Sequence, residues 1–180
     1  DWKVESNNAY VMANEVNDRV VHVEVKASVP ESMTQRIPLN LSLVLDHSGS
    51  MSGAQMDDAR EALITMLEAL HPEDRVSVVA FSTRVQVLQV QDEWGDVKKA
   101  KLMEKLAELR PGGTTAMREA LSAGLNQVRK RFDAGAINRV MLLSDGIPND
   151  ASQLVSLATG ARQGNIAITT FGLGPYYNED

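Results

Sequence analysis

The sequence predicts an α/β fold in which a doubly wound, mostly parallel central sheet carries helices on both faces. After residue 38, short apolar runs alternate with longer segments whose apolar residues recur at helical spacing. The short runs are apolar almost throughout, as expected for strands that are covered on both faces. Strands that alternate with helices are typical of βαβ units, in which consecutive strands lie parallel.

The first part of the chain has a different pattern. Residues 10–13 and 20–27 are rich in β-forming residues, and the second run alternates apolar with polar side chains. Such alternation is typical of a half-exposed antiparallel strand. We therefore expect residues 1–37 to form an N-terminal β-hairpin extension followed by a connector, and residues 38–180 to form the main domain.

The elements of the main domain follow from the apolar pattern. Core strands are expected at residues 41–45, 76–81, 140–143 and 166–169. A further run at residues 85–90 follows the second strand so closely that it is expected to be an edge strand, antiparallel to it. Helices with one apolar stripe are expected at residues 53–70, 97–109, 116–132 and 151–162. Trp94 stands beside two acidic residues and is expected in an exposed loop or helix start.

Composition excludes several classes of function. The 180 residues carry a net charge of −6, which argues against general affinity for nucleic acid or for an anionic membrane. The absence of cysteine excludes disulfides, thiol catalysis and thiolate metal sites. No apolar stretch approaches the roughly 20 residues that span a bilayer, so we expect no transmembrane segment in this chain.

Oxygen-bearing side chains follow two of the predicted strands. Asp46, Ser48 and Ser50 come directly after the first core strand, and Asp145 follows the strand at 140–143. The loop at residues 110–115 ends in two threonines and leads to the same edge. Ligands of doubly wound sheets bind outside the carboxyl ends of the strands. Carboxylates and hydroxyls together are hard donors suited to Mg²⁺ or a similar ion.

The run between Gly49 and Gly53, rich in glycine and serine, raises a second chemistry, namely the nucleophilic serine of a G-x-S-x-G elbow. In hydrolases of that kind the histidine base comes late in the chain. The histidines here are His22, His47 and His71, and no histidine follows the last of them. We therefore do not expect a nucleophilic serine in this run.

Three blocks lie in order at the predicted carboxyl edge: DHSGS at 46–50, GGTTAM at 112–117 and LSDG at 143–146. In order and separation they resemble the metal-ion-dependent adhesion site (MIDAS) of the von Willebrand factor type A (VWA) domain. The resemblance covers about residues 39–174 and implies the Rossmann-like VWA fold. Members of this family usually continue into one more helix, so the main domain is expected to lack its last helix.

The resemblance also implies a set of ligands. The five metal ligands would be Asp46, Ser48, Ser50, Thr115 and Asp145. The two serines would coordinate directly, whereas Asp46 would act mainly through water. Thr114 is the alternative ligand from the loop, and Thr115 is favoured because it stands five residues before Ala120, the interval usual in the family.

The function that the resemblance implies is adhesion through a divalent ion, Mg²⁺ or else Mn²⁺ or Ca²⁺, which coordinates an Asp or Glu carboxylate of a partner protein. The expected setting is a bacterial-type, extracytoplasmic protein that is secreted, periplasmic or on the cell surface. The alternative is a non-catalytic VWA subunit of an intracellular chelatase or ATPase-type assembly, with a cytoplasmic location. In both cases the resemblance implies that this chain is not an enzyme, and neither function involves nucleic acid.

Overall fold

The computed structural model describes residues 2–6, 21–25, 36–146 and 151–173, and the chain divides into the units Asp1–Arg36 and Ile37–Asp180. In the first unit, β1 (Trp2–Ser6) pairs antiparallel with β2 (Val21–Val25). β2 lies within the run predicted as a strand. Its partner is β1 rather than the predicted strand at residues 10–13, which lies outside the described residues. Residues 2–6 also alternate apolar and polar residue types, but the run is too short to be recognised without its pair.

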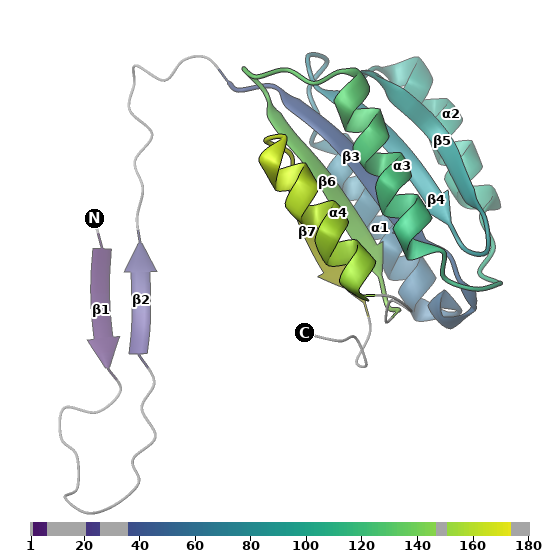
Figure 1. Ribbon diagram of the computed structural model, residues 1–180, viewed down its shortest axis with the longest axis horizontal. Helices are drawn as coiled ribbons and strands as arrows, with labels where there is room; N and C mark the ends of the chain where they lie inside the picture. Colours follow the sequence, from purple (N-terminus) through teal and green to yellow (C-terminus); the bar gives the residue numbers. More distant parts are fainter. Residues whose placement is uncertain (1, 7–20, 26–35, 147–150, 174–180) are drawn as a thin grey trace, which may run out of the picture. The chain divides into compact units, whose positions relative to one another are not determined.

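The second unit contains a five-stranded sheet of order β5-β4-β3-β6-β7 (Figure 1). Its strands are β3 (Leu39–Asp46), β4 (Arg75–Phe81), β5 (Val85–Glu93), β6 (Ile137–Ser144) and β7 (Ala167–Gly172). β3 pairs parallel with both β4 and β6, and β6 pairs parallel with β7. β5 pairs antiparallel with β4, as its sequence position predicts.

Helices cover both faces of this sheet, which confirms the predicted fold class. They are α1 (Ala54–Glu68), α2 (Asp96–Glu108), α3 (Met117–Lys130) and α4 (Ala151–Gln163), with the short 3₁₀ helix η1 (Gly49–Met51) before α1. Figure 1 shows α3 and α4 on one face and α1 and α2 on the other. The prediction that a last helix is missing concerns the chain after β7, and residues 174–180 lie outside the described part. None of the helices in the described ranges combines the length and apolar character needed to cross a membrane.

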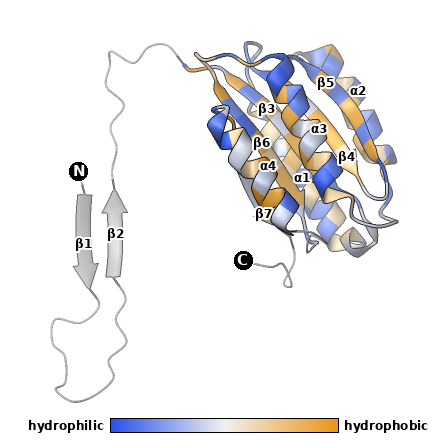
Figure 2. Cartoon of the chain, viewed as in Figure 1, coloured by the Kyte–Doolittle hydropathy of each residue, from blue (hydrophilic) through white to orange (hydrophobic). Residues whose placement is uncertain are grey.

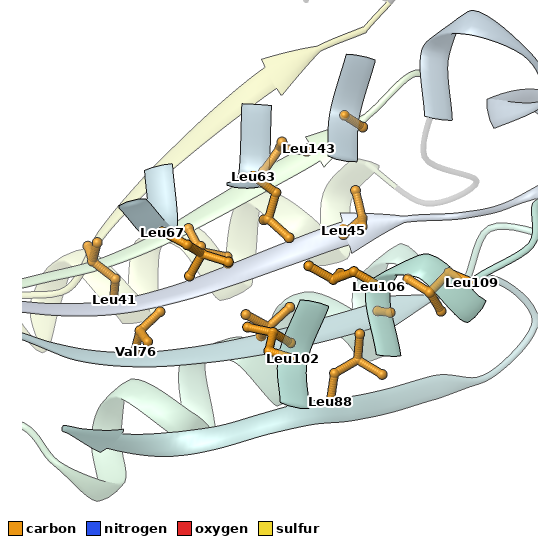
Figure 3. Packing of buried hydrophobic residues seen from close by; sticks show 14 of the residues in the cluster. Leu41, Leu45, Leu63, Leu67, Val76, Leu88, Leu102, Leu106, Leu109 and Leu143 are labelled. Carbon is orange, nitrogen blue, oxygen red and sulfur yellow. The ribbon is translucent and has the colours of Figure 1, made fainter. Parts of the chain in front are cut away.

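The central strands are apolar on both faces because each face packs against helices. In β3, Leu43 and Leu45 belong to the core beneath α1 and α2, whereas Val44 between them belongs to the core beneath α3. Figure 2 shows the resulting hydrophobic colour along the central strands, and Figure 3 shows leucines of α1 and α2 over β3 and β4. The continuous apolar runs in the sequence are thus explained by the two cores.

Trp94 corrects one prediction. It stands two residues before α2, but only 8% of its surface is exposed, and its indole N–H donates to the carbonyl of Leu67 at 3.0 Å. Its backbone N–H donates to the carbonyl of Asp74 at 2.8 Å. The acidic neighbours in sequence suggested exposure, but Trp94 belongs to the core between α1, α2 and the sheet, and its indole is bonded to α1.

α3 approaches the sheet unusually closely at Gly124. A Cβ added there would lie 2.7 Å from Cγ2 of Val44, 3.1 Å from Oγ of Ser42 and 3.3 Å from Cγ1 of Val140. Val44 and Val140 are both fully buried, and a branched side chain in a packed strand has little freedom to move. The absence of a side chain at Gly124 therefore sets the distance between α3 and the sheet.

Gly124→Ala is expected to lower the free energy of unfolding by about 1–2 kcal/mol, because overpacking outweighs the gain in helix propensity of about 1 kcal/mol. Gly160 in α4 is the matched control, since a Cβ there would meet no atom within 4 Å. Gly160→Ala is expected to raise the stability by about 0.5–1 kcal/mol. Urea unfolding of both variants measures the difference, and two stabilising substitutions would contradict the close packing of α3.

Asn40 organises the end of the sheet opposite to Asp46. It is fully buried near the start of β3, and its Nδ2 donates to the carbonyls of Val128 at 3.1 Å and Arg131 at 3.0 Å. Nδ2 also donates to Oδ1 of Asn138 at 2.7 Å, while Oδ1 accepts from Nε2 of Gln91 at 2.8 Å. The last carbonyls of a helix lack partners within the helix. The side-chain amide of Asn40 donates to two such carbonyls, those of Val128 and Arg131, and so joins the end of α3 to the sheet.

Candidate metal centre

Two carboxylates lie at the carboxyl edge of the sheet. Asp46 is the last residue of β3, and Asp145 directly follows the last residue of β6. Because β3 and β6 are parallel neighbours with Leu45 opposite Leu143, both strands end at the same edge. The sequence prediction that these two carboxylates lie on one edge agrees with this register.

Asp46 is held in place by two hydrogen bonds. It has no exposed surface, its Oδ1 accepts from the backbone N–H of Ser48 at 2.7 Å, and its Oδ2 accepts from the hydroxyl of Ser144 at 2.5 Å. The hydroxyl oxygen of Ser144 in turn accepts from the backbone N–H of Gly146 at 3.0 Å. The orientation of the carboxylate is thus fixed by Ser48, in the connection after β3, and by Ser144, at the end of β6.

The serines connect Asp46 to Asp145. Ser48 is 1% exposed, and its hydroxyl oxygen lies 3.1 Å from that of Ser50. The hydroxyl of Ser50 donates to Oδ1 of Asp145 at 2.9 Å. Four of the five predicted ligands are therefore joined by hydrogen bonds, Asp46 through the backbone N–H of Ser48 and the other three through their side-chain oxygens. Asp145 is nevertheless 99 positions from Asp46 in the sequence.

The two threonines of the α2–α3 loop have different surroundings. The hydroxyl of Thr114 donates to Oγ1 of Thr83 at 3.3 Å, so it is engaged by the β4–β5 turn. The Thr115 side chain lies near Asp46, because a Cβ added at Gly146 would be 3.3 Å from the methyl carbon Cγ2 of Thr115 and 3.6 Å from Oδ2 of Asp46. These contacts favour Thr115 over Thr114 as the ligand from the loop, which stays a prediction.

The charges of this group are not balanced by protein cations. None of the ion pairs within the described ranges includes Asp46 or Asp145. A fully buried carboxylate without a cation is costly, and a bound ion would offset that cost. In the same ranges no group of three or more His, Cys, Asp or Glu side chains could hold a metal. Two carboxylates with hydroxyls are instead a hard-oxygen donor set, which fits Mg²⁺, Mn²⁺ or Ca²⁺.

The serine-nucleophile alternative gains no support from the geometry. The pentapeptide 49–53 has Met51, not serine, at the central position of the elbow, and this methionine is fully buried. Ser50 donates to Asp145, and Ser52 donates to the carbonyl of Gly49 at 2.7 Å. The ring nitrogen Nδ1 of His47 lies 3.0 Å from the carbonyl of Arg110. No serine hydroxyl of the run is bonded to a histidine in the described structure.

Ser144 is the residue at this edge to which the sequence analysis assigned no role. Ser144 lies within the block at 143–146, which gave it no function, yet its hydroxyl donates to the carboxylate of Asp46. Its position carries the signal: it is the last residue of β6, beside the end of β3. Serine at that position can reach across to the neighbouring strand end.

A family model described as the von Willebrand factor type A domain matches residues 40–180. The chain belongs to this family. This match confirms the resemblance to the VWA family that the sequence motifs indicated. The sheet order and the flanking helices described above are those of the Rossmann-like VWA fold.

Relatives in sequence are considerably longer than this VWA chain. An uncharacterized protein of Synechocystis, sll0103, is 32% identical over 167 residues, which cover 91% of this chain and 39% of that protein. Inter-alpha-trypsin inhibitor heavy chain H2 of Sus scrofa is 31% identical over 157 residues, covering 81% of this chain and 16% of that protein. The chain thus spans well under half of the length of either relative.

Solved structures share the fold. A von Willebrand factor type A protein from Catenulispora acidiphila has a TM-score of 0.66 and 22% identity, with 96% of this chain and 40% of that chain covered. The manganese-loaded TRAP protein of Plasmodium vivax has a TM-score of 0.67 and 24% identity, with 78% and 59% covered. At this level of identity the two likenesses show the fold.

Proposed function

We propose that this VWA domain is a protein-binding, adhesion-type module that holds a divalent ion at the carboxyl edge of its sheet. The observation that carries the proposal is the hydrogen-bonded group of Asp46, Ser48, Ser50 and Asp145, whose buried carboxylate, on Asp46, forms no ion pair with any residue in the described ranges. Thr115 is the fifth proposed ligand. The proposed ion is Mg²⁺, with Mn²⁺ or Ca²⁺ as alternatives of the same hard-ligand class.

The chain's own residues prepare the site before any ion is bound. Ser48 and Ser144 fix both oxygens of Asp46, so little ordering of this carboxylate remains to be done. Ser50 holds Asp145 beside the serines through its hydroxyl proton. When bound, a divalent ion would supply a Lewis-acidic position for a hard oxygen donor, and the Asp or Glu carboxylate of a partner is the donor that we propose.

The proposed role is non-catalytic. Binding through a bridging ion needs no nucleophile and no proton transfer, and the hydroxyls at this edge bond to carboxylates, carbonyls or other hydroxyls. An extracytoplasmic location belongs to the same proposal, since it is the setting expected for adhesion. Relatives such as the inter-alpha-trypsin inhibitor heavy chains are consistent with a protein-binding role for the family.

Capture from the native extract tests this function. The immobilised chain is expected to retain a partner in Mg²⁺ at about tenfold or more the amount retained in EDTA, and Asp46→Asn is expected to retain none above background. Direct binding of the purified partner in both conditions confirms the contact. Retention that is equal in EDTA, or equal with Asp46→Asn, would contradict a metal-bridged contact. An ATPase as the cation-dependent partner would favour the assembly-subunit alternative over adhesion.

A further inference from the structure

The loop between α2 and α3 is held by segments on either side of it. On the side of β3, the backbone N–H of Gly112 donates to the carbonyl of His47 at 2.9 Å, and that of Gly49 donates to the carbonyl of Gly113 at 3.1 Å. Gly113 has a φ of +81°, in the left-handed region that favours glycine. These bonds attach the first half of the loop to the segment that carries the predicted serine ligands.

The β4–β5 turn holds the second half of the loop. The hydroxyl oxygen of Thr83 accepts from the backbone N–H of Thr114 at 3.0 Å and from the hydroxyl of Thr114 at 3.3 Å. The carbonyl of the adjacent Ser82 accepts from the backbone N–H of Ala116 at 2.9 Å. The residues immediately before and after Thr115 are therefore both bonded to this turn.

Close packing supports the same contact. A Cβ added at Gly113 would overlap Oγ1 of Thr83, so the glycine is needed for the hydroxyl to reach the loop. Thr83 itself is exposed and contributes nothing to either hydrophobic core. Its contacts with Gly113 and Thr114 are directed at the loop, and the sequence analysis gave it no role.

We propose that Thr83 is a positioning residue of the metal centre, which fixes Thr115 by bonding the residue that precedes it. The inference rests on the proposed function, in which Thr115 is a metal ligand. Thr83 touches neither carboxylate group in the contacts described above, so it acts through the loop. Without its hydroxyl, the backbone N–H of Thr114 loses its acceptor and the loop gains alternative conformations.

The size of the effect follows from the population of the competent loop. The apparent dissociation constant of a ligand equals the intrinsic constant divided by the fraction of molecules in the binding conformation. A hydrogen bond of this exposed kind changes such an equilibrium by roughly three- to tenfold. For a loop whose binding conformation is a minor population in the metal-free domain, the loss expected in metal affinity is the same three- to tenfold, with no comparable loss in the stability of that domain.

The test is calorimetric titration of the metal-free chain with Mn²⁺. Thr83→Val, which keeps the shape but not the hydroxyl, is expected to raise the dissociation constant by about three- to tenfold. Thr83→Ser keeps the hydroxyl and is expected to bind within about twofold of the wild type. Thr159→Val is the matched control, because it removes another exposed threonine hydroxyl, bonded to the carbonyl of Val155 at 2.9 Å within α4.

A second measurement separates this inference from the proposed function. Amide exchange of Thr114 in the metal-free protein is expected to be faster in Thr83→Val and unchanged in Thr83→Ser. If the wild type bound no Mn²⁺, the proposed function and the role of Thr83 in metal binding would both be rejected. Faster exchange of the Thr114 amide in Thr83→Val would then still support the contact between Thr83 and the loop. Wild-type affinity in Thr83→Val, or equal weakening by Thr83→Ser, would overturn the inference while the metal site stands.

Discussion

Asp46→Asn is expected to abolish the response of the folded protein to divalent ions. The substitution keeps the shape of the side chain and an acceptor for the backbone N–H of Ser48, which lies 2.7 Å from Oδ1. It removes a buried charge that forms no ion pair within the part of the chain that the structure describes. A neutral amide at this position would leave the proposed ion with a single carboxylate, Asp145.

The wild type should be stabilised by the ion through mass action on the folded state. An ion at one hundred times its dissociation constant adds about 2.7 kcal/mol to the free energy of unfolding. For a domain of this size, that corresponds to a rise in melting temperature of roughly 5–10 °C. Thermal unfolding with and without Mg²⁺ or Mn²⁺ measures the rise, and Asp46→Asn is expected to show none.

Two further observations make this result specific. Asp58 lies exposed on α1, so Asp58→Asn serves as the matched control and should keep the full response to the ion. Without the ion, Asp46→Asn removes the buried charge but also the acceptor of the Ser144 hydroxyl, so the two effects oppose each other and the stability should change by less than about 2 kcal/mol. A melting temperature that rises equally in wild type and Asp46→Asn would show that the ion binds elsewhere.

The sheet and the position of the carboxylates could be predicted because both depend on regular geometry. An apolar run such as 41–45 is buried on both faces wherever helices cover both sides of a sheet. Asp46 and Asp145 follow neighbouring parallel strands, and such strands end at one edge. Neither inference needs the conformation of a side chain, so the sequence alone was sufficient.

Contacts between irregular segments could not be predicted in this way. Thr114 and Thr115 are the same residue type at adjacent positions, and the family interval to Ala120 was the sequence's one reason to favour Thr115. The contact between Thr114 and Thr83 and the position of Thr115 beside Gly146 come from the structure alone. Ser144 acts on a residue 98 positions away, and Thr83 on one 31 positions away. The direction of a side chain in a loop depends on such distant partners, which leave no periodic pattern.

Asn40 shows the same limit inside a regular strand. The sequence analysis treated the first core strand as an apolar run that starts at Leu41, and it assigned no role to the asparagine before it. The structure buries Asn40 completely and surrounds it with partners from α3, β5 and β6. A polar residue at the start of a strand is usual at a surface, so only its partners reveal that this residue is buried.

Asn40→Asp is expected to be among the most destabilising conservative substitutions in the domain. It replaces the donor Nδ2 with a carboxylate oxygen that would face three acceptors at 2.7–3.1 Å, on Val128, Arg131 and Asn138. An unpaired charge in a buried site costs about 3–5 kcal/mol. Asn40→Ala removes the same bonds without adding a charge, and it is expected to cost less, about 2–3 kcal/mol.

Urea unfolding at neutral pH measures this order, with Asn126→Asp as the control on the exposed side of α3. The control should change the stability by less than about 0.5 kcal/mol. If Asn40→Asp lowered the free energy of unfolding no more than Asn40→Ala, the three acceptors could not surround the side chain as described.

The effect of Asn40→Asp should be confined to its own end of the sheet. Since Asn40 and Asp46 lie at opposite ends of β3, the folded fraction of Asn40→Asp should still bind Mn²⁺. Loss of that binding would mean that the end of α3 held by Asn40 also controls the position of Thr115 at the start of the same helix.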